Sequence, residues 1–149
     1  PNPSSRCCLD SRWRHHRPRA AQPVMVDLLQ IGSDWLSDQL QQHASRPVTY
    51  QRGVETVPLG ATIGRTVFEL TGDEGIVERI ESRDFLIPAV DLVLAGQTVL
   101  PERGDQIIET DINGTFTYEV MAPGDEPPWR YSDPYRKTLR VHTKLIAES

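Results

Sequence analysis

The sequence predicts a mainly β protein, a small β-barrel or sandwich with one N-terminal helix. Two observations lead to this prediction. Short strand-like segments, separated by glycine, proline and Asn-Gly turns, fill residues 48–146. One stretch, residues 26–44, instead has apolar residues at helical spacing. Strands this short and frequent are typical of small barrels and sandwiches.

The chain has the length of one domain and an uneven distribution of charge. Its 149 residues suffice for a single core. Residues 1–24 hold five arginines and one aspartate, so they carry +4 in a chain of net charge −5, and residues 25–149 carry −9. We expect residues 1–24 to be a disordered basic leader upstream of a natural start at Met25. A basic nucleic-acid-binding tail is the alternative for this leader. Residues 25–149 are expected to form a single β-rich domain.

Cysteine usage and hydropathy limit the cellular setting. Both cysteines, Cys7 and Cys8, fall in the basic leader. The remaining residues therefore form no disulfide or thiolate metal site, which favours an intracellular protein. The longest apolar runs, such as residues 92–95, are far shorter than the roughly 20 residues of a membrane span. We expect no association with a membrane.

Residues 26–44 form the predicted helix. Apolar residues recur three and four positions apart, and the glutamines at positions 39, 41 and 42 supply a polar face. Gly32 weakens the first turn, and Ser33-Asp34 offers a cap for a restart. Arg46-Pro47 is expected to end the helix, because a residue before proline avoids the α region. The apolar positions are Leu28, Leu29, Ile31, Trp35, Leu36 and Leu40.

Alternating side chains and turn residues predict the strands. Residues 48–52 alternate and stop at Gly53, and a second extended piece, residues 54–59, is expected to be broken by Pro58 and Gly60. Further strands are expected at residues 65–70, 76–82, 85–87 and 105–110, with a turn at residues 72–75 and one helical turn or a further strand at residues 89–95.

The last third of the chain carries the strongest local signal. Asn113-Gly114 separates two extended runs and predicts a hairpin with a type I′ turn, because both residues tolerate positive φ angles. The final strand, residues 138–146, is expected to turn Leu139, Val141, Thr143 and Leu145 to one face and His142 outward.

No motif predicts a catalytic, cofactor or metal site. Residues 109–114 resemble half of an EF-hand loop, but Val120 stands where the loop needs a bidentate glutamate. The acidic pairs Asp73-Glu74 and Asp125-Glu126 lie in expected turns, whereas acid–base chemistry needs carboxylates in a partly dry pocket. We therefore predict a protein that is not an enzyme and that holds no cofactor and no metal.

Arg103 belongs to two motifs. Arg103-Gly104-Asp105 spells an adhesion tripeptide, but nothing in the sequence indicates secretion, so we predict a tight turn with Gly104 at a positive φ. A cluster of Arg103 with Arg79 and Arg83 could bind nucleic acid. The charge of −9 on residues 25–149 opposes this interpretation, because it repels phosphates.

The proline-rich residues 127–135 form the candidate partner-binding segment. Prolines stiffen the loop, and tryptophan, tyrosine and arginine are enriched at interface hot spots. An equally weighted interpretation is that Trp129 folds back and caps the core. The residues assigned to partner binding are Trp129, Arg130, Tyr131, Tyr135 and Arg103.

Several segments follow one another in a characteristic order. They are the helical residues 32–36, the extended residues 48–53, residues 84–89 with Asp91-Leu92, residues 101–107, residues 118–120, the proline-rich loop with Trp129, and the strand at residues 139–144. In this order and texture the chain resembles the head-tail joining, or stopper, proteins of tailed bacteriophages and their prophages.

The resemblance implies a structural role. Such proteins are small β-barrels or sandwiches that assemble as a homo-oligomeric ring between portal or adaptor and tail proteins. They help retain packaged DNA, which passes through the lumen without specific binding. The chain would then be cytoplasmic in the bacterial host and part of the virion neck once assembled, and we expect a monomer in isolation. The alternative is a small β-barrel interaction module that binds a peptide or single-stranded nucleic acid.

Overall fold

The computed structural model describes residues 27–71 and 77–149 and shows a mainly β chain with one helix, as predicted. The basic leader and the predicted turn at residues 72–75 lie outside the described residues. α1 (Leu28–His43) is not long and apolar enough to cross a membrane. The strands are β1 (Ser45–Arg52), β2 (Glu55–Thr71), β3 (Val77–Pro88), β4 (Val93–Leu94), β5 (Gln97–Thr98), β6 (Gln106–Asp111), β7 (Gly114–Val120), β8 (Trp129–Tyr131) and β9 (Thr138–Glu148).

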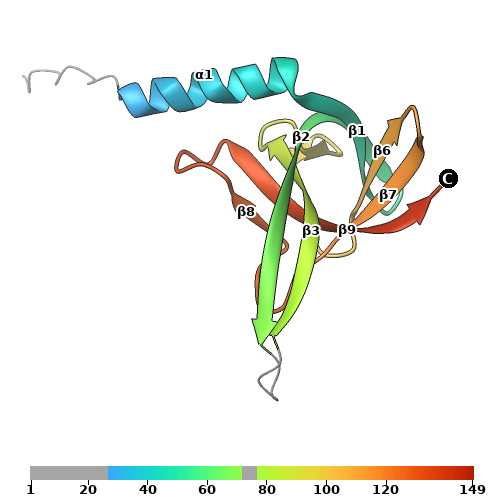
Figure 1. Cartoon of the computed structure of the whole chain (residues 1–149). Coiled ribbons are helices and arrows are strands. Elements are labelled where there is room, and N and C mark those ends of the chain that lie inside the picture. The colour runs from blue at the N-terminus through green and yellow to red at the C-terminus, as the bar shows by residue number, and fades with distance from the viewer. Residues whose placement is uncertain (1–26, 72–76) are drawn as a thin grey trace, which may run out of the picture.

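Six strands close into a barrel (Figure 1). The antiparallel order is β3-β2-β1-β6-β7-β9, and β9 returns to pair with β3. β8 pairs with residues 139–141 of β9, next to the stretch of β9 that pairs with β7. The predicted fold class, a small barrel or sandwich with one N-terminal helix, is confirmed in its barrel form.

β2 and β3 are long continuous strands, whereas the sequence predicted shorter pieces. β2 runs through Pro58 because only β1 pairs with it there; its pairing with β3 begins at Thr62. A strand bonded on one edge tolerates a residue without an N–H. At Gly60, an added Cβ would stand 3.1 Å from the side-chain oxygen of Gln41 in α1. The predicted breaks at Pro58 and Gly60 are therefore wrong, and this glycine serves a close approach between helix and strand.

β6 and β7 form the predicted hairpin with a different turn. Asp111 pairs with Gly114, so Ile112 and Asn113 occupy the centre of the turn. Among described residues other than glycine, positive φ angles occur at Ala95 and Arg136, so the predicted type I′ geometry at Asn113 is wrong. Instead the Asp111 carboxylate accepts a hydrogen bond from the backbone N–H of Asn113 at 2.7 Å, which fixes the turn locally.

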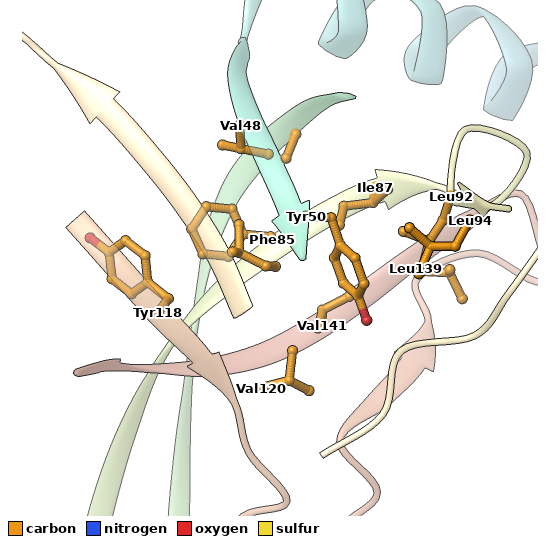
Figure 2. Packing of buried hydrophobic residues seen from close by; sticks show 12 residues of the cluster. Val48, Tyr50, Phe85, Ile87, Leu92, Leu94, Tyr118, Val120, Leu139 and Val141 are labelled. Carbon is orange, nitrogen blue, oxygen red and sulfur yellow. The ribbon is translucent and has the colours of Figure 1, made fainter. Parts of the chain in front are cut away.

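The core is filled by alternate side chains from the barrel strands and by Leu92 and Leu94 from the segment between β3 and β6 (Figure 2). Phe85 is fully buried, and its ring meets Tyr118 edge to face with centroids 5.3 Å apart. α1 contributes no buried residue to this core. The buried hydrophobic residues are Val48, Tyr50, Ala61, Phe85, Ile87, Leu92, Leu94, Ile107, Tyr118, Val120, Leu139 and Val141.

Replacement of Phe85 by alanine tests this core. We expect Phe85→Ala to lower the free energy of unfolding by about 3–5 kcal/mol, because it removes apolar contacts and leaves a cavity. Ile112→Ala is the control, since Ile112 is fully exposed at the β6–β7 turn, and should change stability by less than about 0.5 kcal/mol. Urea unfolding followed by circular dichroism measures both, and equal losses would contradict the assignment of Phe85 to the core.

Candidate functional site

The candidate partner-binding segment begins at β8. Trp129 and Tyr131 are half-buried, pack against the barrel core and meet each other edge to face, with ring centroids 5.3 Å apart. Arg130 is exposed between them. Trp129 thus caps the core, as one of the two interpretations predicted. The assignment of these residues to partner binding stays a prediction.

One carboxylate shapes the loop between β8 and β9. Asp133 accepts hydrogen bonds from the backbone N–H groups of Tyr135 at 2.9 Å, Lys137 at 3.0 Å and Thr138 at 2.7 Å. Arg136 adopts a φ of 59° in this loop, and its guanidinium lies 5.7 Å from the centroid of the Tyr131 ring, a cation–π distance. The segment from β8 to β9 is therefore a defined turn built on Asp133.

This loop also holds the helix. The Tyr135 hydroxyl donates to Asp27 Oδ2 at 2.8 Å, and the Lys137 ammonium forms an ion pair with Asp34. The hydrogen bond from Tyr135 lowers the pKa of Asp27, and the same bond raises the pKa of Tyr135. In Figure 1 the loop before β9 reaches toward α1 across the end of the barrel. Tyr135, one of the predicted partner-binding residues, is thus an anchor for α1.

α1 is one uninterrupted helix that begins earlier than its predicted restart. Asp27 caps it, because its carboxylate accepts a hydrogen bond from the backbone N–H of Leu29 at 2.9 Å. The predicted cap at Ser33-Asp34 is wrong, since the helix continues through Gly32 to His43. Asp34 instead serves the ion pair with the β8–β9 loop.

A groove of about 410 Å³ lies between α1 and the barrel. Sequence patterns do not predict this groove, because it depends on how the helix packs across the strands. Its apolar wall comes from Leu40 on the helix and from Leu86, Pro88 and Val90 on the barrel, and its charged residues are Asp38, Asp91, Arg136 and Lys137.

Arg103 lies in a different part of the chain from the β8–β9 loop. It is exposed in the turn before β6, where Gly104 has a φ of 94°, so the predicted tight turn is confirmed. No hydrogen bond or salt bridge among the described residues joins Arg103 to Trp129, Arg130, Tyr131 or Tyr135. The structure therefore does not bring all five predicted partner-binding residues into one contact network.

The aspartate of the adhesion tripeptide is buried. Asp105 accepts hydrogen bonds from the Tyr50 hydroxyl and from Arg52, whose Nη2 lies 2.7 Å from Asp105 Oδ2. Burial raises the pKa of Asp105, but the bonds from Arg52 and Tyr50 outweigh it and lower the pKa overall. Burial and Asp105 together raise the pKa of Tyr50. Because Asp105 is committed to these partners, the tripeptide is not displayed.

A second buried carboxylate joins β3 to β9. Asp84 and His142 are paired in register, and Asp84 Oδ1 lies 2.9 Å from His142 Nδ1. The hydroxyls of Ser82 and Thr66 also donate to Asp84, and Arg140 Nη1 lies 3.2 Å from Asp84 Oδ2. Burial raises the pKa of Asp84, but the hydrogen bonds from His142, Ser82 and Thr66 outweigh it and hold the pKa at about 2.

His142 corrects a prediction from strand alternation. Its side chain is 2% exposed rather than turned to solvent, and its ring meets Phe68 of β2 edge to face at 5.0 Å. Val141 and Thr143 are also buried, so this stretch of β9 is covered on both faces. The alternation of side chains along β9 shows which residues share a face of the strand. It does not show that the β2–β3 hairpin covers the outer face of β9.

Each buried carboxylate in the described residues has a cationic partner. Glu109 lies between two arginines, 3.1 Å from Arg46 Nη1 and 2.7 Å from Arg83 Nη2. Both oxygens of this carboxylate are thus occupied by arginine donors. The described residues contain no cluster of three or more histidine, cysteine, aspartate or glutamate side chains placed to hold a metal ion. The polar interior is thus built to join strands.

The Asp84 cluster makes stability depend on pH. Its folded-state pKa of about 2 is below the ordinary value of 3.8, so its contribution is present above about pH 5 and is lost as the pH falls through about 4 toward 2. We expect Asp84→Asn to lose about 3 kcal/mol of stability at pH 7. The difference from wild type should shrink by roughly 2 kcal/mol between pH 5 and pH 2. Urea unfolding across this range measures it. Asp125→Asn, at an exposed turn, is the control, and a constant difference for Asp84→Asn would contradict the cluster's role.

A comparison with known protein families identifies the family of this chain. The family model described as phage head-tail joining protein matches residues 26–149, which include α1 and every strand of the barrel. No curated protein matches the chain. Because the family match covers well over half of the sequence, the chain belongs to the phage head-tail joining protein family.

Proposed function

We propose that this chain is a non-enzymatic neck protein that joins the portal end of a phage head to the tail and helps retain packaged DNA. The family match over residues 26–149 is the observation that carries the proposal. It supports a structural part of a phage-like particle, with portal or adaptor proteins on one side and tail proteins on the other.

The chemistry of the buried groups fits an assembly role. Asp84, Asp105 and Glu109 each bind arginine, histidine or hydroxyl donors that belong to other strands. These contacts stabilise a rigid barrel and leave none of the three carboxylates unpaired. A neck protein needs such a scaffold, because it must present fixed surfaces to the rings above and below it.

The docking surface of the proposal is the end of the barrel that carries β8 and its loop. Arg130 is exposed between Trp129 and Tyr131, and Tyr135 holds the helix beside them. Aromatic residues with an adjacent arginine are common at interface hot spots. Arg103 is exposed in the turn before β6 and is proposed as a separate contact.

The proposal also includes the assembly state and the path of DNA. The chain is a monomer in isolation and forms a homo-oligomeric ring when a portal or tail surface brings copies together. Residues 25–149 carry −9, and a lumen with this sign of charge repels phosphates, so DNA slides through without specific binding.

Reconstitution tests the joining role. Mixing the purified chain with portal rings and tail components of one phage should give ring-shaped neck complexes by electron microscopy. We expect Arg130→Glu to weaken this binding at least about tenfold, roughly 1.4 kcal/mol, because it reverses a charge at the centre of the docking surface. Arg79→Glu, on the β2–β3 hairpin and also exposed to solvent, is the matched control.

Two outcomes would contradict the proposal. One is the absence of any complex with portal or tail components. The other is a salt-dependent shift of single-stranded nucleic acid by the chain, which would favour a small-barrel binding module instead.

A further inference from the structure

α1 turns its polar side toward its own barrel. A helix that packs on a domain normally buries an apolar stripe. Here the half-buried residues are polar except for Leu40. Asp34 pairs with Lys137 of the β8–β9 loop, and the Gln41 side chain lies close to Gly60 of β2. The half-buried residues of the helix are Ser33, Asp34, Ser37, Gln39, Leu40 and Gln41.

The opposite side of α1 is apolar and exposed. Leu28, Ile31 and Trp35 follow one another at three- and four-residue spacing, and their exposed fractions are 80%, 49% and 63%. Leu29 and Leu36 flank them and are also exposed. We call these five residues the helix stripe. A contiguous apolar stripe on a surface marks an interaction site.

The charges around the helix stripe restrict what covers it. Residues 27–44 contain neither lysine nor arginine. Asp27 and Asp34 are engaged by Tyr135 and Lys137 of the β8–β9 loop, whereas Asp38 is exposed three residues after Trp35 and borders the helix stripe. Two such helices packed side by side would place like charges together, which opposes association. The complementary surface is therefore an apolar groove bordered by cations.

Such a groove exists on this chain between the β2–β3 hairpin and the β7–β9 pair. Its volume is about 470 Å³, and we call it the β7–β9 groove. Its apolar side chains are Ile63, Tyr118 and Leu145, and Leu145 is 50% exposed. Its lining holds three cations, Arg65, Arg83 and Lys144, against one carboxylate, Glu81.

The cations of the groove have partners within the chain. Arg65 pairs with Glu81 at 2.7 Å, Arg83 with Glu109 at 2.7 Å and Lys144 with Glu119 at 3.2 Å. Arg65 and Lys144 remain more than half exposed, so a neighbouring carboxylate can share them. The hollow beside Leu70 is the opposite case, since its charged lining residues are Glu69, Asp125 and Glu126, and it would repel the acidic helix.

The stripe and the groove lie at different sides of the molecule. The groove includes residues 143–145 of β9, in the half of the strand that leads to the C-terminus. In Figure 1 that half of β9 runs to one side of the barrel and the N-terminal half of α1 extends to the other. A surface pair placed this way joins one copy to the next and does not join a copy to itself.

We propose that α1 of one copy packs its helix stripe into the β7–β9 groove of a second copy. This inference rests on the proposed homo-oligomeric ring and assigns its contact surfaces. An amphipathic helix in an apolar groove is a common mode of recognition. Because the contact is heterologous, each copy uses one stripe and one groove, and repetition closes into a ring where the rotation permits.

Cross-linking between engineered cysteines tests the contact. The variant carries Trp35→Cys and Leu145→Cys in a chain with Cys7→Ser and Cys8→Ser, and a short bis-maleimide reagent is added at high protein concentration. We expect a ladder of dimers, trimers and larger species on a denaturing gel, because every link leaves a free stripe and a free groove. Either single-cysteine variant should stay monomeric. The absence of a ladder both for the chain alone and with portal rings present, or a strong dimer from Trp35→Cys alone, would overturn the proposal.

Charge reversal separates this contact from non-specific association. Arg65→Glu with Lys144→Glu should reduce the cross-linked ladder at least about fivefold, and Asp38→Lys added to that pair should restore part of it. Arg65→Lys with Lys144→Arg should keep it. Arg79→Glu is the matched control, because Arg79 is an exposed, glutamate-paired cation on the same hairpin outside the groove. Thermal unfolding confirms that each variant is folded, and an equal loss with Arg79→Glu would overturn the proposal.

Reconstituted neck complexes distinguish this contact from the joining role. If the double-cysteine chain binds portal and tail components but gives no cross-link between positions 35 and 145 in the complex, the stripe-in-groove contact is wrong and the joining role stands. If the chain forms the ladder but binds neither component, the contact stands and the joining role fails.

Discussion

The pairing of β3 with β9 is the contact on which the rest of the structure depends. It closes the barrel, and the buried Asp84 lies opposite His142 in its register. A shift by one residue would turn both groups to the other face and leave an ionised carboxylate in the apolar core. β9 in turn carries β8, and the loop that joins them holds α1 through Tyr135 and Lys137. The position of the helix therefore follows from the closure of the barrel.

The helix is attached by polar contacts and has its apolar side free. An isolated helix of this length is marginal in water, so most helices in proteins depend on apolar packing. α1 instead relies on the Asp27 cap, the ion pair of Asp34 with Lys137 and one apolar contact side chain, Leu40. A partner that covers the helix stripe would add the missing apolar packing. Binding and helix stability are then coupled, which suits a protein that completes its structure within an assembly.

Much of the fold is predictable from local patterns, and the exceptions have physical causes. The helix, the β6–β7 hairpin and the turn at Gly104 follow from spacing and from backbone preferences. The continuity of β2 through Pro58 cannot be predicted from the local sequence, because it depends on the fact that β3 does not pair with β2 at this position. The burial of His142 is hidden too, since Phe68 comes from another strand. The side of α1 that meets the barrel cannot be read from periodicity, because the usual rule places the apolar side inward. The proposed surface at β8 was indicated by residue type alone.

Charge explains why the proposed assembly needs a template. Copies of a domain with −9 repel one another at long range, and the repulsion grows as they converge in a ring. In a dimer, a single helix–groove contact must overcome this repulsion. In a closed ring, each copy makes two such contacts, one on each side, and both oppose the repulsion. A portal or tail surface that binds several copies raises their effective concentration, so a pairwise contact that is weak in solution becomes sufficient there. The same acidity would oppose association of isolated copies and, in the proposed ring, would line the channel with charge of the same sign as DNA. A single property of the composition thus fits both the delayed assembly and the free passage of DNA that the proposed neck role requires.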